Sequence, residues 1–138
     1  YKIPVGWTRV AVRVVGKYDG GDNAWMHMDG RAGEWAVAYH GTKYDCLPHI
    51  LHQGLKAGPR QACKATCGEG IYCTPDIPTA LGYSATVSLP GEDGKARAVQ
   101  FIMQCRVRPD AIRKASDTVW VINDPTNIRP YGVLVRTT

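Results

Sequence analysis

Short β-type segments separated by turn-forming residues constrain the fold of this chain more than any other feature. Glycine, proline, asparagine and aspartate lie between the segments, as in YDGGDN at 18–23, and these residues favour tight turns. Strands are predicted at 8–16, 25–28, 35–41, 70–74, 98–107, 118–122 and 132–136. Because strands outnumber helices, we predict an α+β domain built on antiparallel sheets.

Two short helices are predicted, both ahead of the longest strand. In residues 45–55 the apolar side chains recur at helical spacing, and glycines near the end are stop signals. Pro48 is compatible with this helix because it falls in the first turn. The second helix is predicted at 78–85, after the sequence Thr-Pro-Asp at 74–76.

The whole chain is predicted to form one compact domain. Its 138 residues, 44% of them hydrophobic and 21% charged, suffice for one sizeable core and are too few for two. We expect residues 1–34 to form a strand or hairpin extension packed on a core that spans residues 35–138. Loops are expected at 57–70 and 88–95, and a short connection at 109–117.

The net charge and the cysteine content limit the classes of partner and the cellular compartment that we expect. Seventeen Lys and Arg against twelve Asp and Glu give a net charge of +5, which suits an anionic ligand but is spread too evenly to mark a nucleic-acid surface. The sequence has no apolar run of about eighteen residues, so we expect no membrane partner. Five cysteines are an odd number, which favours a reducing, intracellular compartment. The start, YKIPVGW, lacks an initiator Met and a signal-peptide pattern, and we expect a processed or partial chain.

His40 and Tyr72 are the first candidates for a functional site, because each lies in a glycine-framed motif. The chain reads Tyr-His-Gly-Thr at 39–42 and Gly-Ile-Tyr-Cys-Thr-Pro at 70–75. A histidine at the end of a buried strand, directly before glycine, can present its ring to a cleft while the glycine backbone admits a ligand closely. Tyr83 follows Tyr72 by eleven residues. Taken singly, such residues are ordinarily a core histidine bonded to a backbone carbonyl, and tyrosines used in packing.

Taken together, the motifs resemble the catalytic domain of the poly(ADP-ribose) polymerase-like ADP-ribosyltransferases of diphtheria-toxin type. The order is His-Gly-Thr, HILHQGL, Gly-Glu-Gly-Ile-Tyr and Ala-Leu-Gly-Tyr, and the stretches AVQFIMQCRVRP and VWVINDPTNIRPYGVLV are similar to that family's last strands. The resemblance covers about residues 35–138 and leaves residues 1–34 unexplained. It implies a split β-sandwich of antiparallel sheets, with a few short helices, around an NAD cleft.

The resemblance also implies roles for single residues. His40 would bond the ribose hydroxyls of NAD, and backbone groups of Gly41, within the motif that Thr42 completes, would hold the nicotinamide carboxamide. Tyr83 would stack on the nicotinamide ring, with Tyr72 as the opposing wall. A flat aromatic ligand with a carboxamide fits such groups.

A loop at 58–69 would cover the adenosine and pyrophosphate side of NAD, where Arg60 and Lys64 could meet phosphate charge; such exposed basic residues are more often simply solvated. The implied reaction cleaves the nicotinamide glycosidic bond through an oxocarbenium-like state and passes ADP-ribose to a macromolecular acceptor. We expect a protein acceptor rather than nucleic acid, NAD as the co-substrate and no metal.

The sequence departs from the family's pattern at two positions. Polymerising members carry a Glu where the penultimate strand opens, and alignment puts Val119 there, with Asp117 as the nearest carboxylate. Valine cannot accept a hydroxyl hydrogen bond or a proton, so we expect transfer of single ADP-ribose units, slow NAD hydrolysis, or binding without turnover. A Ser that binds the carboxamide in many relatives is Ala80 here, and Thr79 is a possible substitute.

Three other interpretations stay open. The RNA 2′-phosphotransferases also begin with a His-Gly-Thr strand, but their second motif has His where Tyr72 stands. A pseudo-transferase that binds nucleotides or proteins without turnover is compatible with Val119 and Ala80. A structural zinc site is the third interpretation, although the candidate zinc ligands lack the spacing of a zinc ribbon. Those ligands are Cys46, His49, His52, Cys63, Cys67 and Cys73.

Overall fold

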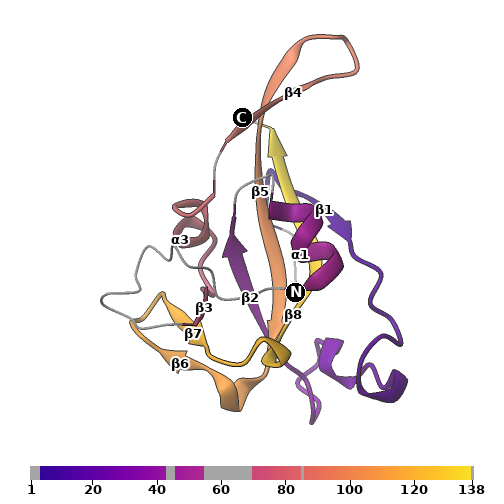
Figure 1. Ribbon diagram of the computed structural model, residues 1–138, viewed down its shortest axis with the longest axis vertical. Helices are drawn as coiled ribbons and strands as arrows, with labels where there is room; N and C mark the ends of the chain where they lie inside the picture. Colours follow the sequence, from indigo (N-terminus) through magenta and orange to yellow (C-terminus); the bar gives the residue numbers. More distant parts are fainter. Residues whose placement is uncertain (1–3, 43–45, 55–69, 85, 138) are drawn as a thin grey trace.

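A computed structural model gives the fold of residues 4–42, 46–54, 70–84 and 86–137, and these are the residues described below (Figure 1). They form two antiparallel sheets with few helices, which confirms the predicted α+β class. The larger sheet has the strand order β1-β8-β5-β2, and β4 pairs with the outer part of β5. The smaller sheet has the order β3-β7-β6.

The elements have the following bounds. The larger sheet contains β1 (Thr8–Ala11), β2 (Ala36–Gly41), β4 (Val87–Pro90), β5 (Ala96–Val107) and β8 (Ile128–Thr137), and the smaller sheet contains β3 (Ile71–Cys73), β6 (Arg113–Lys114) and β7 (Trp120–Ile122). The α-helices are α1 (Leu47–Gln53) and α3 (Ile77–Leu81). Short 3-10 turns are η1 (Asp19–Gly21), η2 (Ala24–Met26), η4 (Pro109–Ala111) and η5 (Pro125–Asn127).

The long strands β5 and β8 form the centre of the larger sheet, and both sides of this sheet are covered. Along β2, Ala38 packs in a cluster with Leu47 and Ile50 of α1, whereas Tyr39 packs on the opposite side with Ala80 of α3. Successive strand residues point to opposite faces, so the two helices lie against opposite faces of β2. The first cluster also contains Ile71 from the smaller sheet.

Within the described residues, an isolated β-bridge between Tyr39 and Thr74 joins the two sheets. The Tyr39 amide donates to the Thr74 carbonyl at 2.7 Å, and the Thr74 amide donates back to the Tyr39 carbonyl at 2.9 Å. This bridge fixes the end of β2 beside β3. It therefore positions the two glycine-framed motifs.

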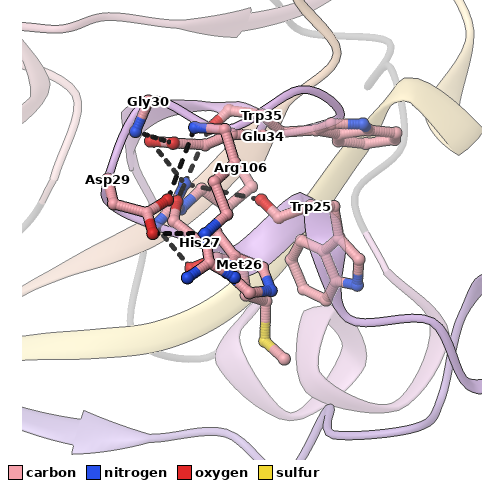
Figure 2. A network of polar contacts seen from close by, with 9 residues as sticks. Trp25, Met26, His27, Asp29, Gly30, Glu34, Trp35 and Arg106 are labelled. Carbon is pink, nitrogen blue, oxygen red and sulfur yellow. Dashed lines mark hydrogen bonds and ion pairs between the residues drawn. The ribbon is translucent and has the colours of Figure 1, made fainter.

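Arg106 organises the segment between η2 and β2 from inside the core. Its side chain is fully buried, and its guanidinium donates to four backbone carbonyls, which Figure 2 shows turned toward it. The acceptors are Trp25, Met26, His27 and Trp35, at 3.4, 3.1, 3.0 and 2.7 Å. A Glu34 carboxylate oxygen lies 3.9 Å away. Buried polar groups need such partners, so Arg106 and this segment stabilise one another.

Several predicted elements were wrong in kind or length. The connection predicted at 109–117 contains the turn η4 and the strand β6, and the strand predicted at 132–136 begins four residues earlier, at Ile128. The strand predicted at 25–28 is instead the 3-10 turn η2, because Arg106 takes carbonyls that a sheet ladder would need. The strand predicted at 8–16 ends at Ala11, after which the chain turns into a separate cluster around Trp25. The loop predicted at 88–95 begins with strand β4, whose pairing with β5 builds the hairpin that projects at the top of Figure 1.

Candidate active site

The ends of β2 and β3 bring His40 to the backbone of Tyr72. The His40 Nδ1 atom lies 2.7 Å from the Tyr72 carbonyl oxygen. A carbonyl oxygen only accepts, so Nδ1 must carry the proton and donate. In the neutral ring this leaves Nε2 as an acceptor, and no described residue bonds it.

The protonation state of His40 follows from its surroundings. Burial lowers the pKa of His40, and the hydrogen bond to the Tyr72 carbonyl opposes that shift without reversing it. The imidazole is therefore neutral at pH 7, with one nitrogen fixed as a donor. The other nitrogen can accept a hydrogen bond from a ligand hydroxyl.

Gly41 lies directly against α3. A Cβ atom at this position would lie 1.9 Å from the Ala80 carbonyl oxygen and 3.1 Å from the Tyr83 Cβ. An ordinary carbon–oxygen contact is about 3.3 Å or longer, so a side chain here would displace the helix. Glycine is thus required for the close approach of β2 to α3. The contact brings Ala80 and Tyr83 beside the His40–Gly41 backbone.

The start of α3 is fixed by a side-chain cap. One Asp76 carboxylate oxygen accepts from the Thr79 amide at 2.9 Å and from the Thr79 hydroxyl at 2.6 Å. The Asp76 amide in turn donates to the Thr74 hydroxyl at 3.0 Å. Thr79, expected as a possible substitute for the family's serine, has its hydroxyl proton committed to this cap. Asp76 was not among the predicted site residues, although an aspartate three residues before a threonine at a helix start is a recognisable capping pattern.

The two tyrosines differ in exposure. Tyr83 is 39% exposed, and Ala80 beside it is buried. Tyr72 is half-buried in β3, opposite Val121 of β7. By strand alternation, Tyr72 points away from the buried side chains of Ile71 and Cys73. Both tyrosines thus present part of their surface outside the main core.

Val119 lies one residue before β7 and is half-buried. Its carbonyl accepts from the amides of Ala115 and Ser116 at 2.9 and 3.2 Å, and its amide donates to the Ser116 hydroxyl at 3.1 Å. Trp120 pairs with Cys73, so Val119 is next in line, opposite Thr74. Asp117 is exposed, two residues earlier.

Other predicted site residues fall outside this constellation. Thr42 is half-buried and follows β2 directly. Arg60, Lys64, Cys63 and Cys67 lie outside the described residues. Among the described residues, no three His, Cys, Asp or Glu side chains are grouped as metal ligands. His49 and His52 are exposed on α1, whereas Cys73 is buried and its burial raises its pKa to about 12.

Comparisons with known proteins add no assignment. No protein-family model matches this chain, and no curated protein matches it significantly. None of the helices in the described part of the chain is long and apolar enough to cross a membrane.

Proposed function

We propose that this chain is a mono-ADP-ribosyltransferase that cleaves NAD to nicotinamide and transfers ADP-ribose to a macromolecular acceptor, with a protein as the favoured class. The observation that carries the proposal is the contact of Gly41 with α3, which gathers His40, Ala80 and Tyr83 from two separate elements. The Tyr72 carbonyl is joined to the same group by the His40 ring. These are the residues to which the sequence resemblance assigned NAD.

The geometry fits the chemistry of a ribose ligand. The Nε2 atom of neutral His40 can accept a hydrogen bond from a ribose hydroxyl, because Nδ1 is held as the donor to Tyr72. Tyr83 is 39% exposed, and its aromatic ring is of the type that would stack on a nicotinamide ring. Positioning by these groups would promote departure of nicotinamide.

In the transfer step, the bond between the ribose C1′ and the nicotinamide nitrogen breaks, and its electron pair leaves with nicotinamide. A lone pair of the acceptor then forms the new bond to C1′, and the acceptor's proton passes to solvent. Val119 cannot take this proton, and valine there cannot orient an incoming ribose hydroxyl. The proposal is therefore limited to the transfer of single units.

Titration calorimetry with NAD tests the proposal on the wild-type chain and on His40→Ala. Loss of the ribose hydrogen bond should weaken NAD binding by about 1–3 kcal/mol, equivalent to about 5- to 150-fold. Nicotinamide release, followed by chromatography, should fall in parallel.

His49→Ala is the matched control, because it makes the same chemical change at an exposed position on α1. It should leave NAD affinity and nicotinamide release unchanged. Equal NAD affinity in His40→Ala and wild type, with both proteins folded, would contradict the proposed site.

A second candidate is NAD or ADP-ribose binding without turnover. The apolar side chain of Val119 favours this alternative, because valine cannot take a proton from the molecule that would receive ADP-ribose. Measurable NAD affinity without nicotinamide release, over hours at high protein concentration, would select this alternative.

A further inference from the structure

A hollow lies at the opposite end of β2 from His40. It has a volume of about 650 Å³ and is formed where β2 begins, β5 ends and β8 begins. Its lining includes Trp35, Glu34, Asp19, Asp22 and Arg108. Trp35 and His40 are five positions apart in the sequence, which corresponds to about 17 Å along a strand. This hollow, here called the Trp35 pocket, is therefore independent of the proposed NAD site.

The basic side chains of the Trp35 pocket are already paired. Arg129 makes two hydrogen bonds of 2.8 Å to the Asp19 carboxylate, and this pairing lowers the pKa of Asp19. The Arg108 Nε atom lies 3.0 Å from an Asp110 oxygen. The Arg129 guanidinium is thus occupied, whereas the Arg108–Asp110 pair is exposed to solvent and is weak.

Two further carboxylates line the Trp35 pocket, and of these only Asp22 lacks an ion pair among the described residues, whereas Glu34 shares the charge of buried Arg106. Asp22 accepts a hydrogen bond from the Ala24 amide at 2.9 Å, and no Lys or Arg in the described residues forms an ion pair with it. Glu34 accepts from the Gly30 amide at 2.7 Å, and its nearest cation, Arg106, is 3.9 Å away. Four carboxylates (Asp19, Asp22, Glu34 and Asp110) and two guanidinium groups (Arg108 and Arg129) line the pocket, which is therefore locally acidic in a chain whose net charge is +5.

The wall of the Trp35 pocket already shows how it holds a cation. The Arg129 guanidinium carbon lies 4.0 Å from the Trp35 ring centroid, 4.3 Å from that of Tyr18 and 5.1 Å from that of Trp25. A guanidinium is attracted to aromatic faces and to bidentate carboxylates. Half-buried Trp35, with Asp22 and Glu34 nearby, offers the same two elements to a ligand.

We propose that the Trp35 pocket binds an arginine side chain of a protein partner. The carboxylates of Asp22 and Glu34 would pair with the guanidinium, and its apolar stem would lie along the indole of Trp35. The volume of the pocket accommodates a side chain with its flanking backbone. The excess of carboxylates over guanidinium groups in the lining favours a cationic partner over a phosphate-bearing one.

The test is a titration followed by the indole N–H signals in two-dimensional nitrogen–proton NMR. The chain has four tryptophans, and a Trp35→Phe variant assigns the relevant signal. The probe is the peptide acetyl-Gly-Arg-Gly-amide, and the control is the same peptide with citrulline, which keeps the shape and lacks the charge. Inorganic phosphate is titrated separately. We expect a saturable shift of the Trp35 signal with the arginine peptide alone.

Matched variants separate the pocket from the general charge of the chain. Asp22→Asn keeps the oxygen that accepts from Ala24 and removes the charge, so the dissociation constant should rise about two- to fivefold. Adding Glu34→Gln should abolish saturation. Asp93→Asn, the same change in the hairpin that joins β4 to β5, should have no effect.

Three results would overturn the proposal. The first is no saturable shift in the wild-type chain, and the second is a saturable shift with phosphate in place of the peptide. The third is an equal effect of Asp22→Asn and Asp93→Asn. The same spectra show whether each variant is folded, and Asp22→Asn alone remains decisive if the double variant is not.

Discussion

Replacing Gly41 with alanine tests the packing that assembles the candidate site. The new Cβ would lie 1.9 Å from the Ala80 carbonyl oxygen. A tolerable carbon–oxygen contact is about 3.3 Å, so α3 or the end of β2 must move by about 1.4 Å. Because the obstacle is backbone and not the tip of a flexible side chain, rotamer changes cannot absorb the overlap.

Gly41→Ala is expected to reduce the rate of nicotinamide release more strongly than it reduces the unfolding free energy. Overpacking of this kind typically costs about 1–3 kcal/mol of unfolding free energy, which lowers Tm by roughly 4–12 °C in a domain of this size. A displacement of 1 Å in a positioned site can reduce a rate by about 100-fold. Gly41→Ala should therefore stay folded at 25 °C while nicotinamide release falls by about two orders of magnitude.

Urea unfolding and nicotinamide release measured on the same preparation provide the assay, and Gly82→Ala is the control. Gly82 has helical dihedral angles (φ −62°, ψ −20°), and its added Cβ would meet only the Thr79 carbonyl oxygen at 3.3 Å. We expect Gly82→Ala to change stability by about 1 kcal/mol or less. Wild-type stability and wild-type activity in Gly41→Ala would refute the reasoning.

Four further predictions concern single residues. Tyr83→Ala should weaken NAD and nicotinamide analogues together in calorimetry, whereas Tyr83→Phe should retain most binding because the π face remains; equal losses in both folded variants would argue against stacking. Val119→Glu should raise nicotinamide release by about 10²- to 10⁴-fold, and a folded variant without any gain would show that this position does not face the reacting ribose. Arg106→Met should lower the unfolding free energy by about 3 kcal/mol or more, because four carbonyls lose their donor; unchanged urea denaturation would refute this. Burial lowers the pKa of His40, so the His40 side chain binds a proton more readily in the unfolded chain than in the folded one. The unfolding free energy should therefore decrease as the pH falls below about 6.5. The variant His40→Gln should show a weaker dependence of unfolding free energy on pH between pH 7 and 5.

Much of the fold could be predicted from local pattern. The apolar run before His40, the long apolar run ending at Val107 and the helical spacing of Leu47 and Ile50 each correspond to an observed element. The apolar periodicity and the flanking glycines or prolines of these segments are local in the sequence, so helix or strand can be predicted for them without knowledge of tertiary contacts. The glycine-framed motifs likewise mark His40 and Tyr72 as candidate site residues from the sequence alone, and the structure places the His40 ring against the Tyr72 carbonyl.

Tertiary contacts decided what the local pattern could not. Residues 25–28 have the composition of a strand, but a buried guanidinium from β5, some eighty residues later, takes their carbonyls and fixes a turn. The need for glycine at position 41 is also invisible in the sequence, because the obstacle belongs to α3. The Trp35 pocket depends on three chain segments that are distant in sequence. Periodicity records which face of an element is apolar, but the partner that a polar or small residue meets is set only when the chain folds.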